Sequence, residues 1–442
     1  MKRLLYTLLF LSAMSLQAQQ ELSLHFMKDV AQSNLTNPAI FNKYKINVSL
    51  PSPYFNFYHS AFSANDIFRK EGTTLVLKTN DLVKLLENDG NLLQTNFSVE
   101  TFSLGIQIKK LQVSFSHAAK FNGYFNYPKG IVDLLWNGNA SSIDKAIDIA
   151  PKLDLMAYQE FGLGIAYQLN NMLTFGGKIK YLNGLGVVHT ERSNATIFTD
   201  AEYYQLTAET DFLLQSAGVP LDVNSANGDF ISFGEFNPEF FSANKGIALD
   251  LGATFNIGEM ISVSASILDV GQINWKDDAK NFTSRGSFSY EGLDLKPLLQ
   301  GDSLSLGNIL DSVEQVFMFE ESPKEFSTSL PTKFYLSGTF KIKSLQLGAL
   351  FYGEAYQQKL YPAFALSARK EFGKIFSLGA VYSIRNKSFN NLGLNMALKL
   401  GPIQLFALSD NLFPLFNPLN AQNANFRFGL NVAVGKKKKN RL

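Results

Sequence analysis

The chain has 442 residues, of which 46% are hydrophobic and 18% charged, and its formal net charge is +2. The near-neutral charge gives no indication of nucleic-acid binding, and the hydrophobic share is sufficient for one large domain or several ordinary ones. The chain has no cysteine, which excludes disulfides and thiolate metal sites.

Residues 1–18 have the pattern of a secretory signal peptide. Lys2 and Arg3 precede an apolar run from Leu4 to about Met14, and the small residue Ala18 ends the segment. No later stretch approaches the 18 or more continuous apolar residues of a spanning helix. We therefore expect an exported chain that would cross a membrane, if it does, with strands.

Residues 19–43 precede the first predicted strand and form a hatch or a periplasmic extension. The segment contains the turn-forming sequence Asn37-Pro38-Ala39. We predict that it folds into the lumen of the barrel described below, with this tripeptide as the candidate hatch element.

In the later chain, large apolar residues alternate with small or polar ones. This alternation predicts strands that have one apolar face and one face of mostly small residues. In "ALDLGATFNI", Leu249, Leu251 and Phe255 share one side, while Asp250 and Gly252 lie on the other. A soluble sandwich would expose long charged side chains on the second face. Small residues there instead indicate the crowded, wet interior of a barrel whose large apolar residues face lipid, and 13% aromatic residues suit its two interfacial belts.

About six hairpins of this kind follow one another, each joined by a tight turn. With a first strand over 44–60 and a last over 426–434, they predict an all-β fold: a single transmembrane antiparallel barrel of about fourteen strands over 44–434. The tight turns and the basic tail 435–442 would be periplasmic. The expected extracellular loops are 126–154, 186–244, 276–331 and 411–424, and segments beginning at Asp81, Ile197 and Gly307 are candidates for short helices or extra strand.

Several charged residues fall on the predicted inner face. They are Lys178, Lys180, Asp250, Lys341, Arg369, Arg385, Lys399 and Arg427. Salt bridges across the lumen are one explanation, and binding of an anionic headgroup or solute by the excess of basic groups is the other.

The sequence contains no recognisable catalytic, cofactor or metal site. Its four histidines, His25, His59, His117 and His189, have no partner at metal-ligand spacing, and no P-loop, H-E-x-x-H or G-x-S-x-G is present. We do not expect an enzyme, although an outer-membrane hydrolase is a third, less favoured alternative.

Long stretches resemble an uncharacterised family of Bacteroidota outer-membrane proteins, a domain of unknown function. They include "EFGLGIAYQLNNMLTFGGKIKYLNGLG", "GIALDLGATFNIGEMISVSASILDVGQINWK" and the ending "NFRFGLNVAVG". The "NPA" before a barrel of this size is also similar to the long-chain fatty acid transporter superfamily, which includes accessory subunits of the type IX secretion system. That resemblance implies a hatch in the lumen and lateral release of a hydrophobic ligand.

Two main functions follow for a protein of the Gram-negative outer membrane. The first is passage of a hydrophobic or small solute. The second is a non-conducting barrel that serves as a docking or accessory subunit of a secretion or surface-assembly system. The expected partners are outer-membrane lipid and lipopolysaccharide, the barrel-assembly machinery, and a hydrophobic ligand or a secretion-system protein, but no nucleic acid.

Overall fold

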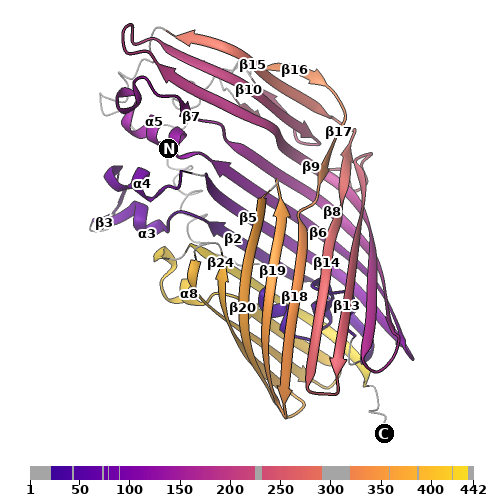
Figure 1. Ribbon diagram of the computed structural model, residues 1–442. Helices are drawn as coiled ribbons and strands as arrows, with labels where there is room; N and C mark the ends of the chain where they lie inside the picture. Colours follow the sequence, from indigo (N-terminus) through magenta and orange to yellow (C-terminus); the bar gives the residue numbers. More distant parts are fainter. Residues whose placement is uncertain are drawn as a thin grey trace.

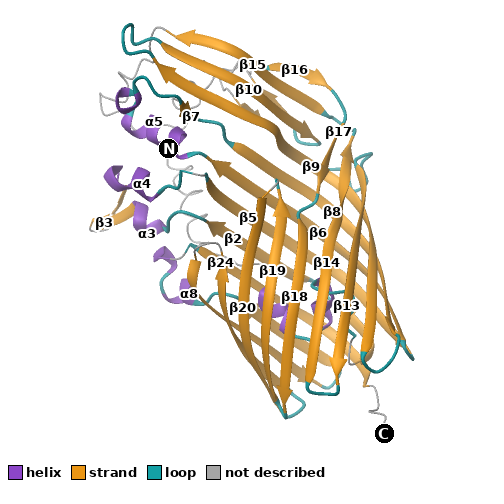
Figure 2. Cartoon of the chain, viewed as in Figure 1, coloured by secondary structure: helices purple, strands orange, loops and turns teal. Residues whose placement is uncertain are grey.

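The computed structural model describes residues 21–41, 44–71, 74–77, 79–88, 90–223, 231–290, 319–357, 359–385, 388–420 and 422–436. Strands make up most of this part of the chain (Figure 2). The predicted signal peptide, the candidate segment at Gly307 and most of the basic tail lie outside the described residues.

Fourteen strand positions close into one antiparallel barrel, which confirms the predicted fold (Figure 1). They are β1 (Tyr44–Ser49) with β2 (Ser52–His59), β5 (Asn91–Ile108), β6 (Leu111–Tyr127), β8 (Lys152–Gln168), β9 (Leu173–Thr199), β13 (Lys245–Ile257), β14 (Ile261–Trp275), β17 (Phe326–Ser329) with β18 (Thr332–Ile342), β19 (Leu345–Tyr356), β20 (Lys359–Phe372), β21 (Phe376–Arg385), β22 (Ser388–Leu400), β23 (Ile403–Ser409) and β24 (Asn423–Lys436). Ile46 of β1 lies opposite both Val434 and Ile106, so the first strand joins the last to β5 and closes the ring.

The predicted tight turns are confirmed at one end of the barrel. The β5–β6, β13–β14 and β18–β19 turns each contain a residue with positive φ: Lys109 at 54°, Gly258 at 62° and Lys343 at 54°. Left-handed residues of this kind allow the short connections that keep neighbouring strands in register.

The two faces of the wall are divided as the alternation predicts. Leu251 is 49% exposed and Ile257 is also 49% exposed on the outside, whereas Asp250 and Ser264 are 3% and 2% exposed on the inside. A closed barrel with an apolar outer surface and a polar interior is the architecture of a membrane-spanning barrel, since every strand edge is paired and lipid contacts only apolar groups.

The first strand differs from its prediction, because 44–60 forms β1 and β2 with a break at 50–51. Pro51 has no backbone N–H to donate to the ladder, so pairing stops there. Both halves pair with β24 and β5 and occupy a single position in the barrel.

The predicted loops 186–244 and 276–331 are wrong in part, because strand continues beyond the long-loop rim. β9 extends to Thr199 and pairs with β10 (Leu206–Ala217), which pairs with β15 (Lys280–Tyr290), itself flanked by β16 (Glu320–Pro323). Apolar residues including Val188, Phe212 and Phe282 cluster on this sheet. The sheet rises above the barrel in Figure 1.

Short helices occupy the same end of the molecule. α3 (Ala64–Ile67), α4 (Thr79–Leu85), α5 (Lys129–Asn137) and α8 (Phe413–Phe416) accompany the small strands β3 (Phe68–Glu71), β4 (Thr74–Leu77), β7 (Ile147–Asp148), β11 (Leu221–Val223) and β12 (Ile231–Phe233). The candidate segment at Asp81 is thus helix, and that at Ile197 is strand. No helix among the described residues is long and apolar enough to cross a membrane.

Candidate functional site: the plugged lumen

The described part of the N-terminal extension, residues 21–41, folds inside the barrel, and we call it the plug. It consists of α2 (Leu22–Phe26), the 3-10 helix η1 (Ala31–Leu35) and the turn that follows. Leu22 and Phe26 pack in one apolar cluster with residues of β14, β18, β19, β20 and β21, and Leu24, Met27 and Val30 pack in another with β22 and β23. The apolar side of the plug therefore contacts the β19–β23 wall.

Polar contacts hold the plug at several points. The backbone N–H groups of Leu22 and Ser23 donate to the Asp410 carboxylate at 2.9 and 2.7 Å. Arg369 of β20 pairs with Asp29 of the plug at 3.0 Å. Because these charged partners are largely buried, removing one of them would leave the other without compensation.

His25 belongs to α2 of the plug, and its side chain is fully buried against the barrel wall. Its Nδ1 lies 3.0 Å from Thr36 Oγ1 and its Nε2 lies 2.8 Å from Ser337 Oγ, and its ring stacks on Tyr335. Burial, and to a smaller extent the nearby Lys28 ammonium, lowers the pKa of His25 to about 3. The docked plug therefore contains a neutral imidazole at every physiological pH.

The tripeptide Asn37-Pro38-Ala39 lies against β9, β13 and β14. The Asn37 side-chain amide donates to the Ala265 carbonyl at 3.2 Å, and its Oδ1 accepts the Ala39 N–H at 2.8 Å. A Cβ on Gly252 would lie 2.1 Å from Asn37 Oδ1, and a Cβ on Gly176 would lie 2.3 Å from the Pro38 carbonyl carbon. These two glycines make room for the turn.

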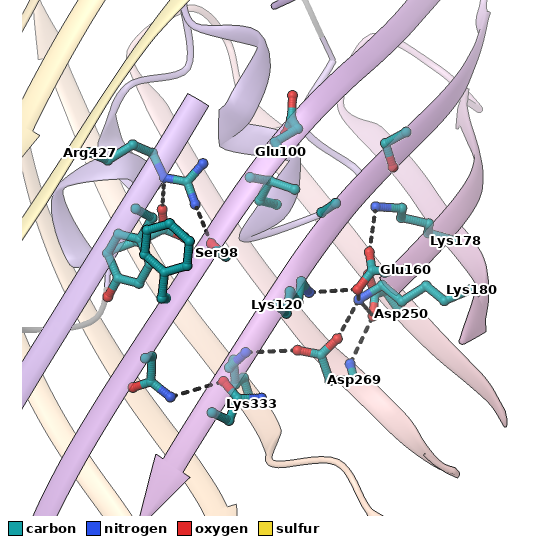
Figure 3. A pocket seen from close by; sticks show the side chains of 18 of the residues that line it. Ser98, Glu100, Lys120, Glu160, Lys178, Lys180, Asp250, Asp269, Lys333 and Arg427 are labelled. Atoms are coloured by element: carbon teal, nitrogen blue, oxygen red, sulfur yellow. Dashed lines mark hydrogen bonds and ion pairs between the residues drawn. The ribbon is translucent and has the colours of Figure 1, made fainter. Parts of the chain in front are cut away.

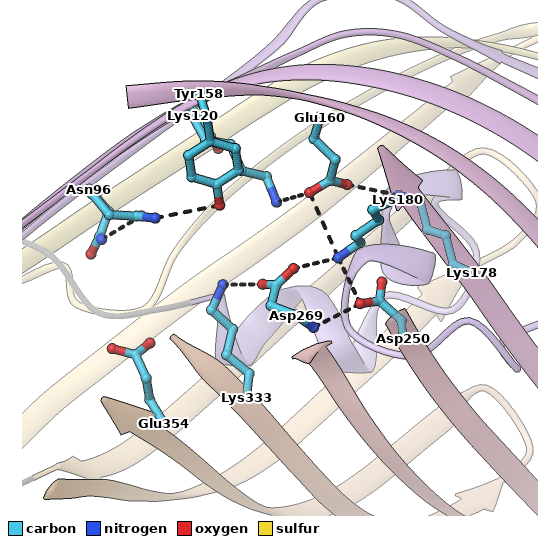
Figure 4. A network of polar contacts seen from close by, with 12 residues as sticks. Asn96, Lys120, Tyr158, Glu160, Lys178, Lys180, Asp250, Asp269, Lys333 and Glu354 are labelled. Carbon is cyan, nitrogen blue, oxygen red and sulfur yellow. Dashed lines mark hydrogen bonds and ion pairs between the residues drawn. The ribbon is translucent and has the colours of Figure 1, made fainter. Parts of the chain in front are cut away.

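Opposite the apolar contacts, lysines and carboxylates form a network that we call the lysine cluster (Figure 4). Its ion pairs are Lys120–Glu160 at 2.5 Å, Lys178–Glu160 at 3.2 Å, Lys180–Asp250 at 2.7 Å, Lys180–Asp269 at 2.5 Å and Lys333–Asp269 at 2.8 Å. Such a network is stable in a low-dielectric interior only because each ion has a partner.

The predicted inner-face residues are thus only partly brought together. Lys178, Lys180 and Asp250 meet in the lysine cluster. The others lie apart: Arg369 on Asp29, Arg427 on Glu21, Lys341 on Glu371, Arg385 on Gln94 and the Tyr58 ring, and Lys399 on the Ala433 carbonyl and the Tyr44 ring. Acids from the plug and from other strands offset most of the expected excess of basic groups.

Two cavities lie beside the cluster, on the β5–β9 side of the plug. The first, of about 90 Å³, is lined by the lysine cluster, Arg427 and several polar side chains (Figure 3). The second, of about 50 Å³, lies between η1 and a wall of small residues that includes Ser114 and Gly164. Spaces of this size hold a few water molecules each, so neither cavity admits a larger solute while the plug is docked.

Sequence reasoning missed Lys120, Glu160 and Lys333, although the signal was present. Each lies an even number of residues from the predicted inward residues of its own strand, just beyond the predicted alternating segment. Asp269 and Glu100 gave no such signal, because strict alternation places both outside. A register shift beside each of them, together with a φ of 60° at Asp269, turns them into the lumen.

Residues 38–410 match the family of unknown function DUF5723. The chain belongs to this family. No curated protein matches the sequence. Similar solved structures include a FadL homologue from Pseudomonas aeruginosa, with 10% identity, coverage of 92% of this chain and 95% of that chain, and a TM-score of 0.44. Another is the toluene transporter TbuX from Ralstonia pickettii, with 8% identity, coverage of 92% and 94%, and a TM-score of 0.44.

Among the described residues, no group of three or more His, Asp or Glu side chains is placed to hold a metal ion. The polar residues of the lumen are arranged as ion pairs and hydrogen bonds around the plug and two small cavities. This arrangement can hold a segment in place, release it and contact a polar solute.

Proposed function

We propose that this DUF5723 member is a gated barrel of the Gram-negative outer membrane that admits a small polar solute when its plug shifts. The apolar outer wall suits lipid, and the polar interior suits a solute that carries hydrogen-bonding groups. The sequence analysis expected a hydrophobic or a small solute, and the polar lining of the cavities favours a small solute that is polar over a hydrophobic one.

One observation carries this proposal: the plug fills the lumen asymmetrically. Its apolar side chains pack mainly on the β19–β23 wall, whereas most of the residues that line the two polar cavities belong to the β5–β9 wall. A structural filler would be expected to pack on all sides. A segment whose apolar packing is confined largely to one wall can detach from that wall and leave its place in the lumen without disrupting the strands.

A reversible cross-link between plug and wall tests the proposal. Ser377 Oγ donates to Asp29 Oδ2 at 3.2 Å, and the chain has no native cysteine. In D29C/S377C, a short bis-methanethiosulfonate reagent would join the plug to β21. We expect swelling of proteoliposomes in a small polar solute to fall to the level of empty liposomes on cross-linking and to recover on reduction.

The single-cysteine variants D29C and S377C, treated in the same way, control for modification of the lumen. Swelling that persists in the cross-linked protein would refute gating by the plug. Absence of swelling for the wild-type protein and for the reduced variant would refute solute passage altogether.

The second candidate, a docking or accessory subunit, is favoured by the sheet beyond the rim. β9, β10, β15 and β16 form a layer with its own apolar cluster, and the adjacent turn exposes Tyr203 by 77% and Tyr204 by 64%. Exposed aromatic residues of this kind are enriched in protein interfaces. Replacing both tyrosines with serine should release a bound partner from the purified native complex without changing swelling.

A further inference from the structure

The two lumen cavities share four lining residues, Leu35, Glu100, Ser116 and Lys178. Leu35 belongs to the plug, and the other three belong to β5, β6 and β9. We call this shared place the junction. Glu100 and Lys178 are its charged residues, and both are labelled around the pocket in Figure 3.

Lys178 is the least compensated member of the lysine cluster. The cluster contains four lysines, Lys120, Lys178, Lys180 and Lys333, but three carboxylates, those of Glu160, Asp250 and Asp269. Within the described part of the chain, the one carboxylate that pairs with Lys178 is that of Glu160, at 3.2 Å. Glu160 is shared with Lys120 at 2.5 Å and Lys180 at 3.7 Å. One positive charge is therefore left over on the side of the cluster that faces the junction.

Glu100 has the opposite imbalance. The side chain is 3% exposed, and among the described residues it makes no ion pair. Its Oε1 accepts hydrogen bonds from Ser103 Oγ at 2.8 Å and from Gln32 Nε2 of the plug at 3.5 Å, and no described residue donates to Oε2. A buried carboxylate with neutral donors alone is poorly compensated.

We propose that the junction is a binding site for a small zwitterionic solute of the amino-acid type. Its ammonium would donate to Glu100, and its carboxylate would accept from Lys178. Such a ligand neutralises both residual charges at once, whereas a simple cation or anion neutralises one and leaves the other buried. The proposal rests on the proposed function and names the class of solute that the barrel admits.

The size and position of the site agree with this class of ligand. The cavities that meet at the junction measure about 90 and 50 Å³, room for several waters that a solute of alanine's size would replace. Gln32 and Leu35 bring the plug to the same place. A ligand bound there would compete with the contact between Gln32 and Glu100 and so favour release of this side of the plug.

Protection of a single cysteine tests binding without requiring transport. In S116C, a neutral methanethiosulfonate reagent would label the junction in the detergent-solubilised full chain. Alanine, added up to its solubility limit, should slow this labelling, whereas choline and acetate at the same concentrations should protect far less. A365C, buried in the apolar contact beneath α2, should react much more slowly than S116C and not respond to alanine.

Removing either charge should abolish selective protection. In E100Q and in K178Q, the alanine concentration that gives half-protection should rise at least about tenfold, the loss of one charge-assisted hydrogen bond. The matched control K341Q removes a lysine that pairs with Glu371 and lines neither cavity, so it should leave protection unchanged. A folded barrel migrates differently on a gel before and after heating, and this heat-modifiable band shows whether a variant folds. If K178Q does not give it, E100Q alone decides.

The proposal is overturned if S116C does not react, if alanine protects no better than choline or acetate, or if E100Q retains full protection. Its failure is distinct from failure of the proposed function. Swelling that depends on the plug without alanine protection would leave solute passage standing and refute the zwitterion site. Protection without any swelling would leave the site standing and refute passage.

Discussion

Two buried groups, His25 and Asp410, change the stability of plug docking in opposite directions as the pH falls. Measuring their contributions separately is the sharpest test of how the plug is docked. His25 has a pKa of about 3 in the docked plug and its ordinary value of 6.5 once exposed. The released plug therefore binds a proton that the docked plug cannot. Docking weakens as the pH falls below about 6.5, and at pH 5 the loss is about 2 kcal/mol, or about 30-fold in the equilibrium.

Asp410 acts in the opposite direction. Burial raises its pKa from 3.8 to about 6, although hydrogen bonds from Ser23, Asn425 and Leu22 lower it in part. In this window the docked state binds more protons than the released state, so docking strengthens as the pH falls. Between pH 7 and pH 5 this strengthens the docking equilibrium about tenfold. Wild-type docking should consequently change only a few-fold over this range.

Single substitutions should expose each contribution. H25Q should make docking about tenfold stronger at pH 5 than at pH 7, and D410N should make it about 30-fold weaker. The assay is the labelling rate of A365C, which is covered by α2 and reacts only when the plug leaves. Dividing each rate by that of a small free thiol measured at the same pH removes the titration of the thiol itself.

The same sign of pH dependence in H25Q and D410N would refute this reasoning. So would a wild-type protein whose A365C labelling rises 30-fold between pH 7 and pH 5, because the Asp410 contribution would then be absent.

Two other substitutions probe the contacts around the plug. G252V places side-chain atoms on Asn37, and this overpacking should destabilise the docked plug by about 1–3 kcal/mol and raise A365C labelling about tenfold or more. The control G338V lies on the lipid side with no atom near its Cβ and should not raise the labelling. K180M leaves the carboxylates of the lysine cluster without their central cation and should lower the free energy of unfolding by about 3–5 kcal/mol, measured by denaturant titration of the heat-modifiable band. K341M, which breaks a more exposed pair, should cost under about 1 kcal/mol, and equal effects of the two would contradict the importance assigned to burial.

The barrel could be predicted from the sequence because its strongest physical requirement is local. Each spanning strand must turn apolar residues to lipid and polar or small residues inward, and a period of two records this in a single segment such as 248–257. The sheet beyond the rim lacks this constraint, since both of its faces meet water or protein. Its strands consequently had the composition of loops: β15 was not predicted, and the start of β10 was predicted only as one alternative for the segment that begins at Ile197.

The docking of the plug is not visible in the sequence for a different reason. Its contacts join residues far apart in the chain, such as Asp29 with Arg369 and Ser23 with Asp410. Periodicity can place Arg369 on the inner face, but it cannot say which of several acids reaches it. Periodicity indicates only the charges on the inner face of the strands. The acids of the plug lie outside any strand, so periodicity does not place them in the lumen.

The register shifts beside Asp269 and Glu100 differ in what they contribute to the stability of the barrel. Strict alternation would turn Asp269 and Glu100 to the lipid, which destabilises a barrel, and each bulge avoids this by turning the carboxylate inward. Inside, Asp269 gains Lys180 and Lys333 as partners, so stability accounts for its position. Among the residues that the structure describes, Glu100 gains only Ser103 and Gln32 as donors. A bulge that buries a charge without an ion pair is a local conflict of the kind that proteins retain at functional sites, and this is why E100Q is the decisive variant for the junction.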